Sequence, residues 1–347
     1  MTDRDSSQAQ QNIRIGVLGA ARIVPMALLK PAEANNEVMV AAVAARDPQR
    51  ANKFAARHGI PRATSSYREL LADPDIDAIY NPLPNGLHGQ WTIAALEAGK
   101  HVLCEKPFTA NAEEAKEVAT AARQTGLVVM EAFHYRYHAL IGRLLEIIAS
   151  GELGEIRHIE TWMCIPLLAR NIRWNLELAG GAMMDVGCYA IHLLRTLAGA
   201  EPVVRTAHAR ELKPGVDRLL RAQFDFEDGR TGAMTASMLS RRLLSIGARV
   251  EGTAGILKVN NPIMPQYRHR IVVHKTNGEK RKEKVAPLPS TYAAQLQAFA
   301  DAVLRNRPYP TNVDDAVANM TVIDQCYAAA GMNPRQPTSF IKQEQSL

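Results

Sequence analysis

The first third of the chain alternates short apolar runs with segments of helical character, and this alternation constrains the fold more than any other feature. The runs are almost continuously apolar, which is typical of strands buried on both faces of a parallel sheet. Repeated strand–helix units of this kind predict a doubly wound sheet, because right-handed crossovers leave few other topologies. The predicted strands are 13–19, 38–45, 76–81, 101–106 and 127–131, and the predicted helices are 23–34, 48–59, 87–98 and 112–125.

A different pattern begins after about residue 135. A helix is expected over 139–149, and consecutive strand-like runs with polar turns follow it, which predicts a mostly antiparallel sheet. These strands are 156–164, 203–211, 218–228, 231–239, 245–253, 255–260 and a hairpin over 270–285, and they precede helices at 292–305 and 313–329.

The 347 residues are too many for one ordinary core and suit two domains. We therefore expect an α/β protein with an N-terminal Rossmann domain, a doubly wound parallel sheet, over 13–135. A C-terminal α+β domain with a large, mostly antiparallel open sheet should occupy 136–335, for substrate binding and dimerisation. Residues 1–12 are expected to be a disordered leader and 336–347 a tail.

Composition and charge argue against several classes of protein. No apolar run reaches the ~18 residues of a spanning helix, and the polar N-terminus has no apolar core of a signal peptide, so we expect a cytoplasmic protein without a membrane partner. The four cysteines lie far apart without CxxC spacing, which predicts buried free thiols and no metal site. The net charge is +6, and the densest basic stretch, 268–284, is interpreted as the solvated edge of a hairpin. It has no interleaved aromatics, so we expect no nucleic-acid partner.

The first predicted strand runs into a turn where dinucleotide-binding folds carry their glycines. Of the GxGxxG pattern only Gly19 is present, and Ala21 and Val24 stand at the other two glycine positions. The turn nevertheless follows the first strand of a βαβ unit, where a helix N-terminus binds a pyrophosphate. We therefore predict a dinucleotide site formed by Gly19, Ala20, Ala21, Arg22 and Ile23.

The tip of the second predicted strand indicates which dinucleotide is bound. NAD-binding proteins place an acidic residue there to hold the ribose 2′-hydroxyl. Here Arg46 follows the strand, and Arg50 lies one turn later. A guanidinium group suits a 2′-phosphate because its planar fork binds two oxygens, so the sequence favours NADP over NAD. The alternative is a surface arginine that pairs with Asp47.

Two more segments follow strands at the carboxyl edge of the predicted parallel sheet, where ligands bind in open α/β sheets. Lys106 precedes Pro107, which restricts the lysine to an extended conformation. Its ammonium group can stabilise a carbonyl oxygen during hydride transfer; an ordinary surface lysine is the alternative. The residues expected near the cofactor from these segments are Asn81, Leu83, Pro84, Asn85, His88, Glu105 and Lys106.

A third cluster lies within 180–192. On a helix, Asp185, Tyr189 and His192 share one face inside an apolar stretch, where unpaired polar groups are costly. Tyr189 can give or take the substrate proton if the Lys106 ammonium lowers its pKa, while Asp185 orients substrate hydroxyls or partners the tyrosine. The alternative is a satisfied polar network in the core.

With these residues in hand, the chain resembles the Gfo/Idh/MocA oxidoreductase family, and most closely its NADP-dependent branch of dihydrodiol and xylose dehydrogenases. The matching stretches follow the family order across about 13–333, and they are GVLGAARI (16–23), YNPLPNGLH (80–88), LCEKPF (103–108), EAFHYRYH (131–138), IRWN (172–175) and GGAMMDVGCYAIH (180–192). The departures are Ala21 and Val24 in the glycine motif.

The resemblance implies roles for individual residues. It implies that Lys106 is the catalytic lysine, often followed by a cis-proline, and that Tyr189 is the acid/base with Asp185 one turn before it. It further implies that Glu131 lies near the nicotinamide, that Arg173 and Trp174 approach the cofactor, and that the open face of the C-terminal sheet forms a dimer.

We therefore expect hydride transfer between NADP and a sugar, at C1 of an aldose, or the carbinol of a cyclic diol or polyol. Lys106 and Tyr189 would be the catalytic pair, with Asp185 and His192 beside them and no metal. Two alternatives stay open: cofactor-assisted glycosidase chemistry, and a non-catalytic regulator of a sugar pathway with the same fold. The sequence specifies neither the exact substrate nor the physiological direction, and His192 is either a substrate contact or structural.

Overall fold

The computed structural model describes residues 12–168 and 170–339, so the expected leader, apart from Asn12, and the end of the expected tail lie outside the described residues. Six parallel strands form the first sheet, in the order β3-β2-β1-β4-β5-β6. The order reverses between β1 and β4, which is the point where ligands bind in open α/β sheets. The strands are β1 (Ile13–Leu18), β2 (Val38–Ala44), β3 (Arg62–Thr64), β4 (Ala78–Asn81), β5 (His101–Cys104) and β6 (Val129–Glu131).

Helices connect these strands as the alternation predicts, and local signals set their ends. The Asp47 carboxylate caps the second helix by accepting from the Gln49 amide, and Gly59 ends it in the left-handed conformation. The short β3 and α3 were missed, because three strand residues carry no periodic signal. The elements are η1 (Pro25–Leu29), α1 (Lys30–Glu33), α2 (Pro48–His58), α3 (Tyr67–Ala72), η2 (Asn85–Leu87), α4 (His88–Glu97) and α5 (Ala112–Thr125).

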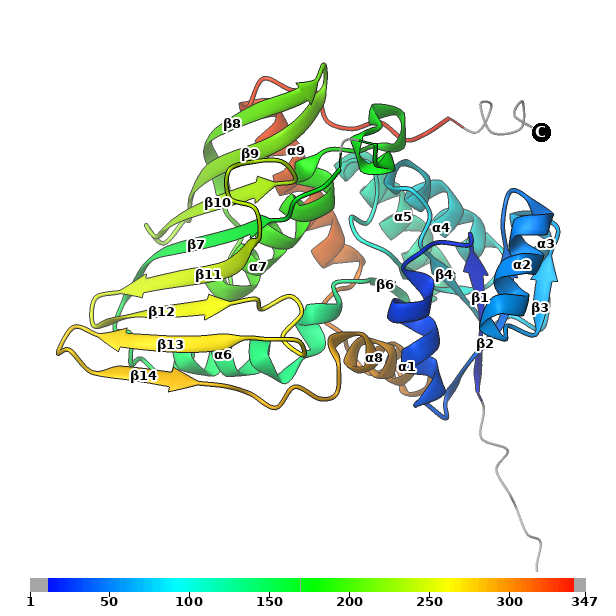
Figure 1. The fold of residues 1–347 in the computed structure, drawn as a ribbon, viewed down its shortest axis with the longest axis horizontal. Helices are drawn as coiled ribbons and strands as arrows, with labels where there is room; N and C mark the ends of the chain where they lie inside the picture. Colours follow the sequence, from blue (N-terminus) through cyan, green and yellow to red (C-terminus); the bar gives the residue numbers. More distant parts are fainter. Residues whose placement is uncertain (1–11, 169, 340–347) are drawn as a thin grey trace, which may run out of the picture.

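The second sheet has eight strands in the order β14-β13-β12-β11-β7-β10-β9-β8, and helices α6 and α7 lie behind it (Figure 1). Among the described strands of this sheet only β7 and β10 pair in parallel, which the sequence did not predict. The elements are η3 (His134–Tyr137), α6 (Ala139–Ala149), β7 (Ile156–Cys164), η4 (Ile172–Trp174), η5 (Leu176–Leu178), η6 (Met183–Gly187), α7 (Cys188–Ala198), β8 (Val203–Lys213), β9 (Val216–Asp225), β10 (Thr231–Ser237), β11 (Ser245–Gly252), β12 (Gly255–Asn260), β13 (Arg270–Lys275) and β14 (Lys280–Glu283). The predicted combination of a Rossmann sheet and a mostly antiparallel sheet is confirmed.

The last two helices, α8 (Thr291–Arg305) and α9 (Val313–Ala329), return from the second sheet to the first. Leu296 and Phe299 of α8 are buried in the same apolar cluster as Ile15 and Leu28 of the first layer. The C-terminal part of the chain therefore completes the core of the N-terminal sheet. The division of domains at residues 135 and 136 stays a prediction.

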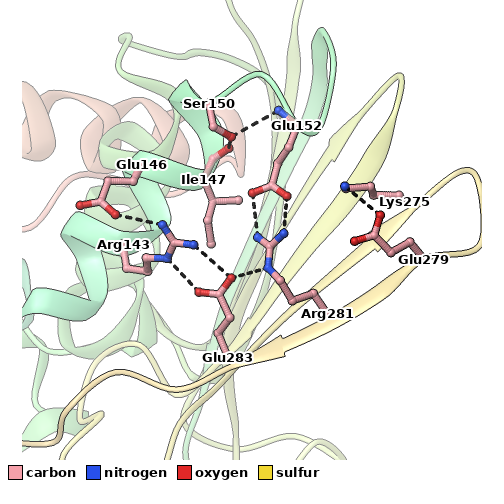
Figure 2. Close-up of polar contacts among 9 residues, drawn as sticks. All are labelled: Arg143, Glu146, Ile147, Ser150, Glu152, Lys275, Glu279, Arg281 and Glu283. Atoms are coloured by element: carbon pink, nitrogen blue, oxygen red, sulfur yellow. Dashed lines mark hydrogen bonds and ion pairs between the residues drawn. The ribbon is translucent and has the colours of Figure 1, made fainter.

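The β13–β14 hairpin forms at Asn277-Gly278 as predicted, but Arg281 and Glu283 of β14 are only partly exposed. Arg281 donates to Glu152 at 2.7 and 2.8 Å, while Glu283 accepts from Arg143 of α6 at 2.8 and 3.1 Å (Figure 2). Lys282, which alternates with them along β14, is exposed. The expectation of a purely solvated edge is therefore corrected, because one face of the strand pairs with the helix layer.

The four cysteines are free and buried, as expected. Among the described residues no helix combines the length and the apolar character needed to cross a membrane.

Candidate active site

The turn after β1 has the backbone that close approach of a phosphate requires. Gly19 has φ +91°, a conformation that side chains disfavour, and a Cβ at this position would lie 3.1 Å from Cδ2 of Leu83. Ala20 is buried, Ala21 and Ile23 are half-buried, and Arg22 is exposed. Val24, at the third glycine position of the motif, is fully buried. The turn thus keeps a glycine where φ is positive, and the two departures are a half-buried alanine and a buried valine.

Arg46 and Arg50 lie at the tip of β2 beside this turn, and both are exposed. Nη2 of Arg50 donates to the Ala20 carbonyl at 3.2 Å, which brings its guanidinium group to the phosphate turn. The Asp47 carboxylate is engaged in capping α2 through the Gln49 amide at 2.9 Å. In the described part of the chain no ion pair joins Asp47 to Arg46, so the surface-pair alternative finds no support.

The loop after β4 is tied to the loop after β5 through His88. Its Nδ1 lies 2.7 Å from the Pro107 carbonyl oxygen, and its Nε2 lies 2.7 Å from the Leu83 carbonyl oxygen. Burial lowers the pKa of His88 to about 4, so the neutral ring donates to one of these carbonyls. The Asn81 amide donates to the His88 carbonyl at 3.1 Å, and Asn85 donates to Ala179 at 3.1 Å. His88 thus joins the loops after β4 and β5, and Asn85 joins the first of them to Ala179; Pro84 lies in the same loop.

Lys106 and Asp185 meet at the centre of the site. Nζ of Lys106 donates to the Asp185 carbonyl oxygen at 3.0 Å and lies 3.4 Å from Oδ1 of its carboxylate, which also accepts from Nε of Arg173 at 2.7 Å. Burial, the largest single effect, lowers the pKa of Lys106, but Asp185 together with the smaller effects of Cys188 and Glu105 outweighs it, and the pKa is raised. Burial raises the pKa of Asp185, yet the two cations beside it lower it overall. At neutral pH the group is therefore an ionised triad, and the Lys106–Pro107 peptide bond is cis, as the resemblance implies.

Tyr189 lies against this triad but is not a phenolate. Nζ of Lys106 is 4.9 Å from the centre of the Tyr189 ring, over its face. Burial nevertheless raises the pKa of Tyr189 well above its usual value, so the expectation of a pKa lowered by Lys106 is wrong. Desolvation of the phenolate outweighs attraction by one neighbouring cation. The Tyr189 hydroxyl lies 3.1 Å from Nε2 of His134, a residue with no role assigned from sequence.

His192 follows Asp185 and Tyr189 along η6 and α7, but its ring nitrogens face other partners. Nε2 lies 2.9 Å from the Asp315 carboxylate of α9, and Nδ1 lies 2.5 Å from the Tyr135 hydroxyl. Its ring also stacks on Phe133 at 4.0 Å. These contacts favour the structural reading of His192 that the sequence left open.

The remaining expected residues surround the same edge. The Tyr80 hydroxyl donates to Glu105 at 2.7 Å, and Nε1 of Trp174 donates to the Leu168 carbonyl at 2.9 Å. Glu131 is fully buried at the end of β6, and neither oxygen of its carboxylate has a hydrogen-bond partner in the described residues. Burial raises the pKa of Glu131 well above its usual value, so it is a neutral acid. The positions of Glu131, Arg173 and Trp174 relative to a nicotinamide stay predictions.

Sequence reasoning missed the partners that distant helices bring to the site. These are His134 and Tyr135 of η3, Thr291 of α8 and Asp315 of α9. Two signals were available for His134 and Tyr135, since they follow strand β6 at the binding edge and lie within the family-matching stretch 131–138. The other two are 157 and 123 residues away in sequence from their partners His134 and His192, and no local pattern indicates them.

Comparison with known protein families gives one match over the strands of the first sheet and another over most strands of the second sheet. Residues 13–133 match a family described as oxidoreductases with an NAD-binding Rossmann fold, and residues 141–258 match the GFO/IDH/MocA C-terminal domain. A D-xylose 1-dehydrogenase (NADP(+)) from Haloferax volcanii is 36% identical over 318 residues, covering 91% of this chain and 96% of that protein. A trans-1,2-dihydrobenzene-1,2-diol dehydrogenase from Oryctolagus cuniculus is 36% identical over 230 residues, covering 65% of this chain and 69% of that protein.

A solved structure agrees with these matches over nearly the whole fold. It is a 3-ketoreductase from Actinomadura kijaniata in complex with NADP and TDP-benzene, 29% identical, with a TM-score of 0.85 over 92% of this chain and 98% of that one. The predicted family is confirmed by the two domain matches and by both dehydrogenases. The expected cofactor agrees with the NADP named for the xylose dehydrogenase and bound to the ketoreductase.

Proposed function

Because the chain belongs to the Gfo/Idh/MocA family and is an NAD(P)-dependent dehydrogenase or reductase acting on CH–OH groups, we propose that it transfers a hydride between NADP and a carbinol carbon of a sugar or cyclic diol. One observation carries this proposal. The ionised Lys106–Asp185 pair and the Tyr189 ring lie together at the carboxyl edge of the parallel sheet, the edge that also carries the Gly19 turn. A cation and a proton carrier at one point are what interconversion of a carbinol and a carbonyl requires.

The residues at the sheet edge fit NADP. The bare backbone at Gly19 accepts the close approach of a pyrophosphate, and the exposed guanidinium groups of Arg46 and Arg50 suit a 2′-phosphate. The loops at Asn81–Asn85 and Glu105–Lys106 would line the rest of the cofactor. When bound, the nicotinamide supplies or accepts the hydride.

The side chains of the site stabilise the charge on the substrate oxygen and transfer its proton. In the direction of oxidation, the ionised form of Tyr189, populated as the pH rises towards the pKa of its hydroxyl, accepts the proton of the substrate hydroxyl. The Lys106 ammonium stabilises the negative charge that develops on the substrate oxygen. Asp185 holds Lys106 in place through two contacts, and Arg173 holds Asp185. In the direction of reduction, Tyr189 returns its proton to the oxygen.

For the substrate we propose a sugar in the first place. The named relatives act on xylose, on a dihydrodiol and, for the solved structure, as a 3-ketoreductase. In each of these activities a ring carbon alternates between carbinol and carbonyl. The Lys106–Tyr189 pair can act on such a carbon at any ring position. A panel of aldoses and cyclic diols with NADP, and of keto sugars with NADPH, would separate these possibilities.

The first experiment is a separate titration of NADPH and NADH against the intrinsic fluorescence of the protein, followed by the substrate panel. We expect tighter binding of NADPH. A Lys106→Ala variant should bind NADPH but lose turnover by about 10²–10³-fold, and the matched control Lys116→Ala, an exposed lysine on α5, should keep both. Retained turnover in Lys106→Ala would contradict the proposed catalytic role of Lys106. A preference for NADH would contradict the proposed cofactor contact of Arg46 and favour the glycosidase-type alternative.

We also propose that the chain is a dimer through the face of the second sheet that α6 and α7 leave uncovered (Figure 1). Light scattering on the purified protein tests this, and a monomer at micromolar concentration would contradict it. The cytoplasmic location expected from the sequence stays a prediction.

A further inference from the structure

Tyr189 is the near end of a line of three hydrogen-bonding side chains. Its hydroxyl lies 3.1 Å from Nε2 of His134, and Nδ1 of His134 lies 2.9 Å from the Thr291 hydroxyl at the start of α8. His134 and Thr291 are 2% and 0% exposed, so water does not compete for these contacts. The His134 ring is also fixed by the Tyr292 ring, 4.1 Å away between centres. The three side chains therefore form an ordered hydrogen-bonded line, and they come from α7, η3 and α8.

The imidazole of His134, in the middle of the line, is neutral and carries a single N–H donor. Burial, with a smaller effect of the Lys106 charge, lowers the pKa of His134 to about 3, so the ring is neutral and carries either Nδ1–H or Nε2–H. With Nδ1–H, the ring donates to Thr291, and Tyr189 must direct its own proton at Nε2. With Nε2–H, Thr291 donates to Nδ1, the ring donates to the Tyr189 oxygen, and the Tyr189 proton is free to face the substrate.

Thr291 decides between the two tautomers. His134 is the only hydrogen-bond partner of its buried hydroxyl within residues 12–168 and 170–339. If Nδ1 carried the hydrogen, the Thr291 hydroxyl proton would be buried without an acceptor, at a cost of about 1–3 kcal/mol. In the Nε2–H tautomer Thr291 donates to Nδ1 and Nε2 donates to Tyr189, so the proton left without a protein acceptor is that of Tyr189, which is 6% exposed and faces the substrate in the proposed function.

We propose that His134 is a positioning residue for Tyr189: its Nε2–H donates to the Tyr189 oxygen, and Thr291 holds it in the tautomer that makes this donation possible. The inference rests on the proposed function, in which Tyr189 exchanges a proton with the substrate. A donor at the oxygen stabilises the phenolate that forms when Tyr189 gives up its proton, and it orients the remaining lone pair towards the substrate. It thereby opposes the burial that makes this phenolate costly.

Other titratable groups around Tyr189 affect the same proton. Two cations favour the phenolate, and they are Lys106, whose ammonium group lies over the ring, and Arg173, whose own pKa is raised in part by Tyr189. The groups that oppose the phenolate come from the strand tip, η6, α7 and α8, and they are Glu105, Asp185, Cys188 and Tyr292. None of them replaces the contact with His134, because that nitrogen is the one hydrogen-bond partner of the Tyr189 hydroxyl in the described structure.

The test is the pH profile of the oxidation reaction, measured with NADP and the best substrate of the panel. Turnover should rise with pH and level off at the apparent pKa of Tyr189. In His134→Leu this pKa should move up by one unit or more, so that turnover below it falls about tenfold per unit. His134→Gln keeps an N–H donor and should stay near the parent, as should Thr291→Ser. Thr291→Val should move the profile in the same direction as His134→Leu by a smaller amount.

A second histidine–threonine pair supplies the control. Nδ1 of His158 lies 2.7 Å from the Thr231 hydroxyl in β7 and β10, away from the site, so Thr231→Val should leave the profile unchanged. NADPH binding, read by fluorescence, should be unchanged in every variant. A lower turnover in His134→Leu and Thr291→Val without any shift of the profile would overturn the inference, as would an equal shift in Thr231→Val. Tyr189→Phe separates the two proposals: full turnover in that variant overturns the proposed function itself, whereas an inactive Tyr189→Phe with an unshifted His134→Leu overturns only the role of His134.

Discussion

Replacing Arg335 by methionine should destabilise the fold strongly, because this guanidinium group is the counter-charge of a fully buried carboxylate. Asp217 of β9 is 0% exposed and accepts from Nη2 of Arg335 at 2.7 Å. The same carboxylate accepts from the Tyr327 hydroxyl at 3.0 Å and from the Met183 amide at 2.7 Å. Nε of Arg335 donates in turn to the Gly180 carbonyl at 2.7 Å. This network fixes the start of the segment that carries Asp185.

The expected magnitude follows from what the substitution leaves behind. Methionine fills much of the space of Arg335, so the main loss is the charge, and the Asp217 carboxylate stays buried with two neutral donors. Removing one partner of a buried ion pair costs about 3–5 kcal/mol. With a urea m-value of about 3 kcal/mol/M, the midpoint of unfolding should fall by about 1–1.7 M.

Urea unfolding followed by circular dichroism measures this loss, and an exposed pair provides the control. Arg205 and Asp225 form an ion pair in which both side chains are nearly half exposed, at 47% and 46%. Arg205→Met should therefore cost at most about 1 kcal/mol. The double variant Asp217→Asn, Arg335→Met should be more stable than Arg335→Met alone, because asparagine removes the unpaired charge and still accepts from Tyr327.

The pH dependence separates the loss of charge from a loss of packing. Burial already raises the pKa of Asp217 despite the Arg335 cation, and without this cation the pKa must rise further. The folded variant then binds a proton that the unfolded chain does not bind until about pH 4, so its stability relative to the parent should improve as the pH falls from 7 to 5. A midpoint of Arg335→Met no lower than that of Arg205→Met, or a deficit that does not change with pH, would refute the reasoning.

Three further predictions concern the site. Gly19→Ala should destabilise the protein by about 1–3 kcal/mol and weaken NADPH binding, because φ is +91° and the new Cβ lies 3.1 Å from Leu83; urea unfolding and a fluorescence titration check both. Arg46→Ala should weaken NADPH binding by about 1.5–3 kcal/mol, roughly 10–150-fold, and leave NADH binding nearly unchanged; equal losses for both cofactors would contradict a contact between Arg46 and the 2′-phosphate. Burial lowers the pKa of His134 to about 3 and that of His88 to about 4, so each binds its proton only on unfolding between about pH 4 and 6.5. Stability should therefore fall on acidification through this range by roughly 1.4 kcal/mol per pH unit for each histidine, and urea unfolding at pH 7, 6 and 5 should show a smaller slope in His134→Leu.

Much of the fold could be predicted because its signals are local. The apolar runs mark the strands of both sheets, and capping residues such as Asp47 and Gly59 mark the ends of a helix to within a residue. The parallel pairing of β7 and β10 could not be predicted, because it depends on how the chain crosses over after β7. The charges of β14 were misread for a related reason. Alternation shows that Arg281 and Glu283 share a face, but only the position of α6 shows that this face is covered.

In the candidate site, too, the local features could be predicted and the long-range contacts could not. The meeting of Lys106 and Asp185 was predictable, because strand tips of a parallel sheet meet at one edge and one helical segment carries the polar cluster. The side chains that tune the cluster were not, since Thr291 and Asp315 arrive on helices that return from the far end of the chain.

The error on Tyr189 shows why proximity to a charge does not settle a pKa. From sequence, one attractive neighbour was visible, and a lowered pKa followed. In the structure Lys106 is indeed 4.9 Å from the ring, but its charge is already engaged by Asp185, and the tyrosine is 6% exposed. Desolvation then dominates and raises the pKa of Tyr189. A buried phenol can exchange a proton only if a second group shares the charge that forms. The proton exchange proposed for Tyr189 therefore requires a partner on its oxygen, and His134 lies 3.1 Å from that oxygen.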